Sequence, residues 1–142
     1  MGPNGAGKTT LFEMISGFVR PDKGAVSLDG RRITGMSPER RSRAGLVRSF
    51  QNAMLFPTLA VGECVAIAAR DSRRGKDAPD SEQVLEAMGL TAYRDDVVSE
   101  LSTGVRRLVE LACDVVTAPR VLLLDEPSAG IAHSEIPRLA DL

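Results

Sequence analysis

The first ten residues carry a pattern suited to holding phosphate groups. Residues 2–9 read Gly-Pro-Asn-Gly-Ala-Gly-Lys-Thr and fit G-x-x-x-x-G-K-[ST], the P-loop pattern. The glycines let the backbone turn its amides inward around an anion. Lys8 supplies a positive charge for the outer phosphates, and the Thr9 hydroxyl can hold Mg²⁺. A helix that starts here adds free N–H groups and the positive end of its dipole. The residues expected to contact the bound nucleotide are Gly2, Pro3, Asn4, Gly5, Ala6, Gly7, Lys8, Thr9 and Thr10.

A glycine-rich turn can also open a helix without binding anything. Such a turn does not require a Lys-Thr pair directly after its last glycine, and Lys8 and Thr9 form that pair here. We therefore predict a nucleoside triphosphate site.

A second motif, Val-Leu-Leu-Leu-Asp-Glu at residues 121–126, supplies carboxylates. The continuous apolar run predicts a parallel strand buried on both faces, which delivers its last side chains to the carboxyl edge of the sheet. We expect Asp125 to hold Mg²⁺ through water, opposite Thr9, and Glu126 to accept a proton from an attacking water. A polar turn after a strand is the simpler interpretation, but the P-loop pattern disfavours it. The two motifs together predict hydrolysis of ATP or GTP.

Composition limits the class of protein. A chain of 142 residues with 43% hydrophobic and 26% charged residues suits one soluble globular domain. No apolar run approaches a membrane span, and no secretory signal opens the chain. A formal charge of -1 and few aromatic residues disfavour a nucleic-acid partner. Cys64 and Cys113 lie in apolar helical segments without metal-ligand spacing, so we expect two buried free thiols.

Residues 1–51 and 118–142 predict an α/β core. The first expected element is a helix that starts at the P-loop, has apolar residues at helical spacing between Leu11 and Phe18, and ends near Gly17. The others are a hairpin of residues 25–29 and 31–33, a short helix from Ser37, a strand over residues 46–50, the strand over 121–125 and a helix from about Ser134. Arg40, Arg41 and Arg43 on the short helix are expected to form a solvated face.

Residues 52–117 predict a mostly helical part. Apolar spacing indicates a helix over residues 61–69, and residues 70–79 are expected to form a mobile surface loop. Asp80 or Ser81 is predicted to cap a helix that Gly89 closes. Ser102 or Thr103 is predicted to cap a longer helix that ends before Pro119.

The order of the motifs resembles one family. Leu-Ser-Thr-Gly-Val at residues 101–105 is similar to the signature motif, LSGGQ, of ABC-type ATPases. Phe-Gln-Asn at residues 50–52 resembles the Q-loop of that family, and residues 128–131 fall where its D-loop lies. The sequences of residues 49–57 and 126–130 most resemble those of the ATPases of branched-chain amino acid importers. The resemblance covers nearly the whole chain.

The resemblance implies a P-loop ATPase core with a parallel sheet and an inserted helical subdomain. It implies that two ATPase subunits pair head to tail and that each ATP lies between one subunit's P-loop and the other's signature. Ser102, Thr103 and Gly104 would then contact the partner's ATP, and Gln51 would contact Mg²⁺ or water. It also implies permease subunits in the membrane, a place on the cytoplasmic face, and ATP hydrolysis that drives import.

The chain departs from the family pattern in several places. Thr103 replaces the first signature glycine, and Val105 replaces the usual glutamine. The strand and the adenine-stacking aromatic expected before the P-loop are missing, as is the switch histidine, since His133 follows Glu126 too closely. These departures predict an incomplete core, truncated at both ends. A truncated fragment that does not hydrolyse ATP, and a soluble ABC-type ATPase outside transport, are the alternatives.

Overall fold

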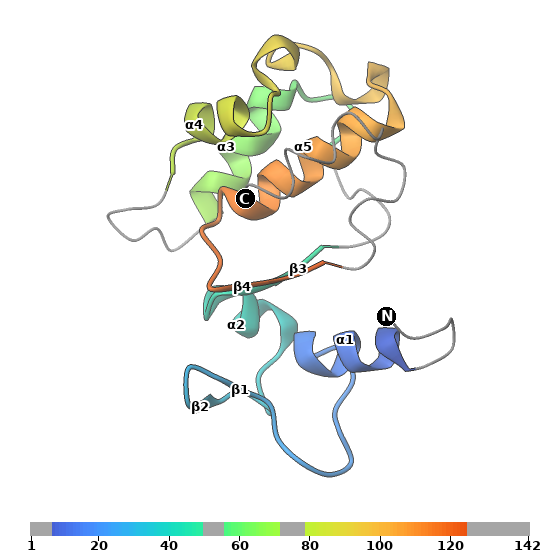
Figure 1. Cartoon of the computed structure of the whole chain (residues 1–142), viewed down its shortest axis with the longest axis vertical. Helices are drawn as coiled ribbons and strands as arrows, with labels where there is room; N and C mark the ends of the chain where they lie inside the picture. Colours follow the sequence, from blue (N-terminus) through green and yellow to red (C-terminus); the bar gives the residue numbers. More distant parts are fainter. Residues whose placement is uncertain (1–6, 50–55, 72–78, 125–142) are drawn as a thin grey trace. The chain divides into compact units, whose positions relative to one another are not determined.

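A computed structural model describes residues 7–49, 56–71 and 79–124 (Figure 1). The chain divides into two compact units. The first comprises residues 1–48 and 119–123, and the second comprises residues 49–118 and 124–142. Each unit is described by itself below. No helix in the described ranges is long and apolar enough to cross a membrane.

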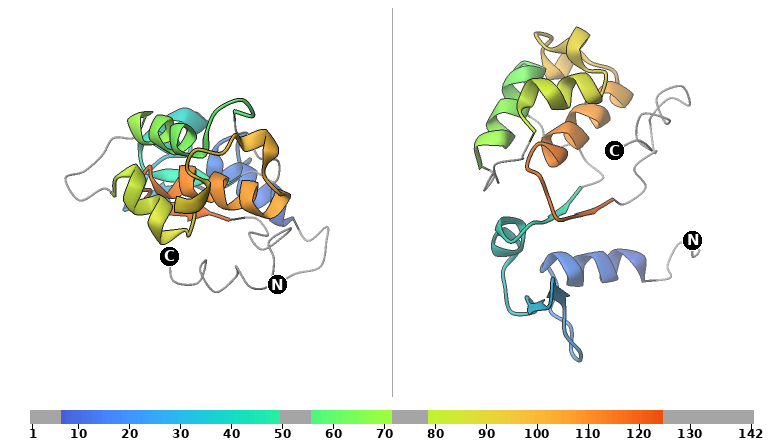
Figure 2. Two further views of the ribbon diagram at one scale, coloured as in Figure 1. Left: turned by 90° about the horizontal axis from the view of Figure 1, so that it is seen from above. Right: turned by 60° about the vertical axis from the view of Figure 1, so that its left-hand side comes forward.

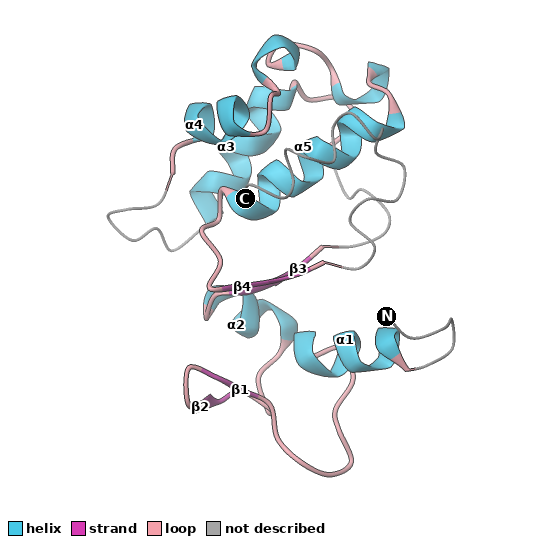
Figure 3. Cartoon of the chain, viewed as in Figure 1, coloured by secondary structure: helices cyan, strands magenta, loops and turns pink. Residues whose placement is uncertain are grey.

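The first unit contains short helices and strands (Figure 3). Its elements are α1 (Lys8–Ser16), β1 (Ser27–Leu28), β2 (Arg31–Arg32), α2 (Pro38–Arg43), β3 (Leu46–Arg48) and β4 (Val121–Leu123). Strands β1 and β2 form an antiparallel hairpin, and β3 pairs with β4 in parallel, with Leu46 opposite Val121. Ser37 is the N-cap residue of α2, and Pro38 occupies its first position, as the sequence predicts.

The second unit is helical, as expected. It contains α3 (Val61–Asp71), α4 (Ser81–Ala87), the 3₁₀ helices η1 (Thr91–Tyr93) and η2 (Val98–Glu100), and α5 (Thr103–Val115). Asp80 caps α4, because its side chain accepts from the Gln83 N–H while the Gln83 side chain accepts from the Asp80 N–H. Gly89 follows α4 with a positive φ of 67°, a backbone conformation that glycine adopts without strain.

The hydrophobic core of the second unit joins its three α-helices. Helix α3 packs against both α4 and α5, and Figure 2 shows the three side by side in both views. Val65, Leu85 and Val109, one from each helix, are completely buried. Cys64 is buried and Cys113 is half-buried, and both are free thiols. The expectation of two buried free thiols is therefore confirmed for Cys64, while Cys113 is only partly enclosed.

Strand β4 corrects one prediction. The apolar run was expected to form a strand buried on both faces, yet Val121 is 37% exposed and Leu124, just beyond β4, is 37% exposed. The reason is the size of the sheet, since within the described residues β4 pairs with β3 alone. A two-stranded sheet covers little of either face. The described core of this unit has only Leu28, Ile33 and Leu46 as buried apolar residues.

Arg41 corrects a second prediction. It was assigned to a solvated face of α2, but it is only 1% exposed. Arg40 and Arg43, on either side of it, are exposed as expected. The side chain of Arg41 turns inward and donates to backbone carbonyls outside α2, two of which, at Met14 and Ile15, are far from it in the sequence.

The two units carry opposite charges. In the first unit, residues 7–48 and 119–123 contain ten basic and four acidic side chains. The second unit, residues 49–118 and 124–142, contains eight basic and fifteen acidic side chains. The formal charge of -1 for the whole chain is thus the sum of two strongly charged parts of opposite sign.

Candidate functional site

The predicted phosphate site lies at the start of α1. Gly7 is the N-cap residue and has a φ of 79°, in the left-handed region that favours glycine. Within the described residues no side chain caps this helix end, and its first turn contains no acidic residue. The first N–H groups of a helix have no partner inside the helix. This end of α1 therefore offers uncapped amides and the positive end of the helix dipole to an anion.

The side chains around this helix end suit phosphate. Lys8 is half-buried, while Thr9 and Thr10 are exposed. The first turn of α1 thus carries an ammonium group and two hydroxyl groups, and these groups match the oxygen-rich outer phosphates of a nucleotide. A Cβ built on Gly7 would meet no atom of the described residues within 4 Å.

The other end of α1 is fixed by backbone and side-chain hydrogen bonds. Gly17, with a φ of 94°, ends the helix, and the N–H groups of Gly17 and Phe18 both donate to the Glu13 carbonyl at 2.9 Å. The guanidinium of Arg41 donates to the carbonyls of Met14 and Ile15. This end of α1 is therefore held while the start of the helix faces outward.

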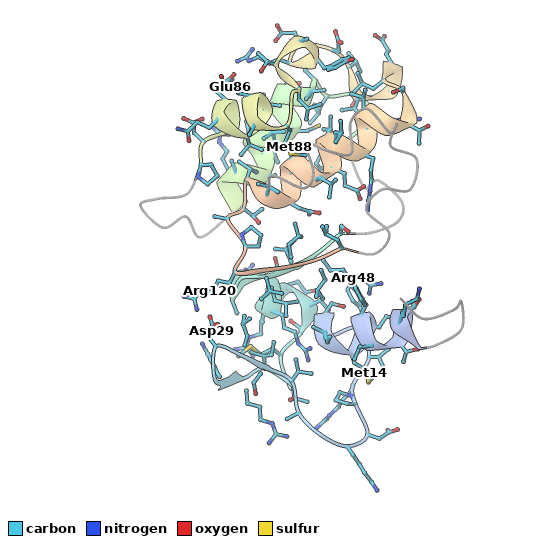
Figure 4. All side chains as sticks on the ribbon, in the orientation of Figure 1. Met14, Asp29, Arg48, Glu86, Met88 and Arg120 are labelled. Carbon is cyan, nitrogen blue, oxygen red and sulfur yellow. The ribbon has the colours of Figure 1, made fainter. Side chains whose placement is uncertain are left out.

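Arg48, at the end of β3, also contacts α1. Its Nη1 donates to the Ser16 hydroxyl at 3.4 Å, and its guanidinium lies 5.8 Å from the centre of the Phe12 ring, over the ring face. Figure 4 shows Arg48 and Met14 on the two elements that meet here.

In the same figure Asp29 and Arg120 join the β1–β2 hairpin to the start of β4, with 2.7 Å between Asp29 Oδ2 and Arg120 Nη1.

The signature-like residues lie at the start of α5. Ser102 is the N-cap residue, and its Oγ accepts from the Val105 N–H at 3.3 Å. The hydroxyl proton of Ser102 stays available to a ligand, because capping uses only an oxygen lone pair. Ser102 and Thr103 are exposed, and Gly104 is half-buried. Of the two predicted caps, Ser102 and Thr103, Ser102 is the one in the structure.

A buried charged cluster on α5 escaped the sequence analysis. Arg107 forms an ion pair with Glu110, and Arg107 Nη2 lies 3.5 Å from the Ser49 hydroxyl. One turn further along α5, burial and the nearby Glu110 carboxylate raise the pKa of Asp114 to about 7, while Arg107 lowers it. The available signal was the helical spacing of the charged residues at positions 107, 110 and 114, which places them on one face of α5.

Several predicted site residues lie outside the described residues. They are Gly2, Pro3, Asn4, Gly5, Ala6, Gln51, Asp125 and Glu126. The described groups therefore form two separate helix ends. Lys8, Thr9 and Thr10 belong to the first unit, whereas Ser102, Thr103 and Gly104 belong to the second.

Comparison with known proteins identifies the family. The sequence pattern of the ABC transporter family matches residues 1–129. The chain is 34% identical over 159 aligned residues to the "High-affinity branched-chain amino acid transport ATP-binding protein BraF" of Pseudomonas aeruginosa, which covers 100% of the chain and 62% of that protein. It is 41% identical over 135 residues to the "Spermidine/putrescine import ATP-binding protein PotA" of Nitratidesulfovibrio vulgaris, covering 94% of the chain and 36% of that protein.

Solved structures agree with this assignment. The structure described as the "ADP conformation of MJ1267, an ATP-binding cassette of an ABC transporter" matches with a TM-score of 0.81 and 29% identity, over 99% of this chain and 61% of that chain. The chain therefore belongs to the ABC transporter family, and the predicted P-loop ATPase fold is confirmed. The chain spans only part of each relative named here, 62% of the length of BraF and 36% of the length of PotA.

Proposed function

We propose that this chain binds and hydrolyses ATP as the ATPase subunit of an ABC transporter. The observation that carries the proposal is the start of α1, where Gly7 adopts a left-handed conformation and no side chain caps the helix within the described residues. Lys8 and Thr9 stand at this point, and a helix start of this kind stabilises a bound phosphate group. Membership of the ABC transporter family supports the same function.

In the proposed site the P-loop residues 2–10 hold the phosphates of ATP. Lys8 neutralises the outer phosphates, and Thr9 binds Mg²⁺ together with Gln51 and Asp125. The donor set fits this ion, because hydroxyl, amide and carboxylate oxygens are the ligands that Mg²⁺ prefers. Bound Mg²⁺ would neutralise charge on the phosphates during hydrolysis. Glu126 would take a proton from the attacking water, and Lys8 and Gln51 would orient the reacting groups.

The second half of the proposed site belongs to a partner subunit. Ser102, Thr103 and Gly104 would contact the γ-phosphate of an ATP that the partner's P-loop holds. The exposed start of α5 supports this assignment, since Ser102 keeps its hydroxyl proton while it caps the helix. We further propose that the ATPase core comprises residues 1–51 and 118–142, and that residues 52–117 form the signature-bearing subdomain.

The proposed partners are a second ATPase subunit and the permease subunits of a transporter at the cytoplasmic face of the membrane. We propose branched-chain amino acids as the transported solutes, which the likeness to BraF supports; the likeness to PotA makes polyamines the second candidate. The test measures uptake of labelled leucine and of labelled spermidine in cells with and without an intact copy of the gene. It distinguishes the two candidate classes of solute. Loss of spermidine uptake alone would contradict the amino-acid proposal.

Two substitutions test the site together. Glu126→Gln should lower the turnover number for ATP by about 10²–10⁴-fold and spare binding, because the amide cannot accept the proton from water. Lys8→Ala should weaken ATP binding itself, because it removes the charge that faces the outer phosphates. Steady-state phosphate release and calorimetric titration with MgATP measure the two effects.

Arg94→Ala is a suitable control, since Arg94 is exposed and its ion pairs with Glu82 and Asp95 are exposed as well. An equal loss of binding in Glu126→Gln would contradict its role as the base. Unchanged ATP affinity in Lys8→Ala would contradict the P-loop assignment.

A further inference from the structure

Helix α1 is weakly held by apolar packing in the part of the chain that the structure describes. Ser16 is its only buried residue, and Leu11 is 52% exposed. Buried apolar surface usually fixes a helix in a protein. Among the described residues of α1, only the partly buried Ile15 packs against the small core of this unit, so polar contacts carry a larger share in fixing the direction of α1 within it.

Arg41 makes polar contacts to the end of α1 and to the segment before α2. Its Nη1 donates to the carbonyls of Met14 at 2.7 Å and Ile15 at 2.6 Å, in the last turn of α1. Its Nη2 donates to the backbone carbonyl of Thr34 at 2.8 Å, and its Nε donates to the backbone carbonyl of Met36 at 3.1 Å. One guanidinium thus ties the end of α1 to the segment between the hairpin and α2.

The electrostatics of this contact favour the arrangement. The last carbonyls of a helix carry partial negative charge, and a buried cation is stabilised beside them. Burial lowers the pKa of Arg41, yet an arginine stays charged because its ordinary pKa is so high. Within the described residues its four hydrogen-bond acceptors are all backbone carbonyls, and none is a carboxylate. The partial charges of α1 are therefore part of what compensates this cation.

Gly17 makes room for this guanidinium. A Cβ built on Gly17 would lie 2.8 Å from Nε of Arg41, closer than a carbon atom can approach without displacement. Gly17 therefore serves two purposes, since it ends α1 in a left-handed conformation and leaves space for Arg41.

We propose that Arg41 is a positioning residue for the nucleotide. An α-helix is a stiff rod, and the nine residues of α1 span only about 13 Å. Fixing the end at Met14 and Ile15 therefore fixes the direction of the amides at the other end and the place of Lys8. This inference rests on the proposed function, in which the start of α1 binds phosphate.

The test compares Arg41→Gln and Arg41→Lys with Leu85→Ala. Leu85 is fully buried in the second unit, so its truncation destabilises the chain without touching α1. The measured quantities are the Kd of MgATP and the Kd of tripolyphosphate, from calorimetric titration, each corrected for the folded fraction. Arg41→Gln should raise both Kd values about tenfold. Arg41→Lys should raise them less, because lysine keeps the positive charge. Leu85→Ala should leave both Kd values unchanged.

Hydrogen exchange separates the possible failures. Arg41→Gln should speed amide exchange in α1 more than in α5, and Leu85→Ala should do the reverse. If Arg41→Gln does not fold, Arg41→Lys gives the same comparison. Unchanged Kd values in the Arg41 variants, with normal binding by the unmodified chain, would overturn this inference alone. Absence of MgATP binding by the unmodified chain would overturn the proposed function and this inference with it.

Discussion

Asp114 shows how burial changes one carboxyl group. Its Oδ2 is buried without a hydrogen-bond partner among the described residues. Desolvation disfavours its charged form, and the neighbouring Glu110 carboxylate adds repulsion that Arg107 only partly offsets. The pKa of Asp114 rises from 3.8 to about 7 for these reasons.

This shift predicts a pH-dependent stability. Between pH 3.8 and about 7 the folded chain binds a proton at Asp114 that the unfolded chain does not bind. The free energy of unfolding should therefore fall as pH rises through this window, by up to about 1.4 kcal/mol per pH unit, and should level off above it. Asp114→Asn should remove this contribution and should make the chain more stable than the unmodified protein at pH 8. Urea unfolding at several pH values measures the effect, and parallel stability curves for the two proteins would contradict it.

At the level of single elements, α4 depends on its capping box. The helix has only seven residues, so the Asp80 and Gln83 hydrogen bonds satisfy a large share of its free backbone groups. Its buried side, Val84 and Leu85, then contributes to the core shared with α3 and α5.

Removing the cap should destabilise the second unit. Asp80→Ala should lower the free energy of unfolding by about 1 kcal/mol, because it leaves the Gln83 N–H without its acceptor. Asp80→Asn keeps an acceptor and should cost much less. Asp95→Ala is the matched control, since Asp95 is exposed and pairs only at the surface. Equal losses in Asp80→Ala and Asp95→Ala, measured by urea unfolding, would argue against the cap.

For the whole molecule, the two units differ in how much apolar surface their described residues bury. The core of the second unit draws on α3, α4, η2 and α5, whereas the described core of the first contains Leu28, Ile33 and Leu46. Local stability follows such burial. The two units should therefore open separately.

Amide exchange under native conditions should reveal this difference. Amides of α3 and α5 should exchange last, and amides of the β1–β2 hairpin and α1 should exchange first. Exchange followed by mass spectrometry of peptides from each unit would measure it. Similar protection in both units would show that they unfold together. A saturating concentration of MgATP should slow exchange in α1 selectively, if α1 binds the nucleotide as proposed.

Local signals in the sequence were sufficient for much of the fold. Asp80 and Ser102 cap their helices, and each is one of the two candidates that the sequence predicts for its helix, because capping depends on residues within one turn. The start of α1 likewise follows from Gly7, Lys8 and Thr9, which are adjacent. The P-loop and signature patterns led to the family that comparison confirms.

Contacts between distant segments could not be predicted in this way. Arg41 is buried because carbonyls at Met14 and Thr34 reach it, and no local pattern encodes that meeting. The exposure of Val121 depends on how many strands flank β4, which an apolar run does not specify. The burial of the ion pair of Arg107 and Glu110 could not be predicted either, since it depends on which segments cover α5.

The opposite charges of the two units have a consequence for the protein in solution. At pH 7 the chain is close to electroneutral, so little overall repulsion keeps its copies apart. The basic unit of one copy attracts the acidic unit of another, and this attraction is screened beyond about 8 Å at physiological ionic strength. The solubility of the chain should therefore rise with ionic strength. A solution of the protein should become turbid on dialysis into dilute buffer and should clear again when sodium chloride is restored.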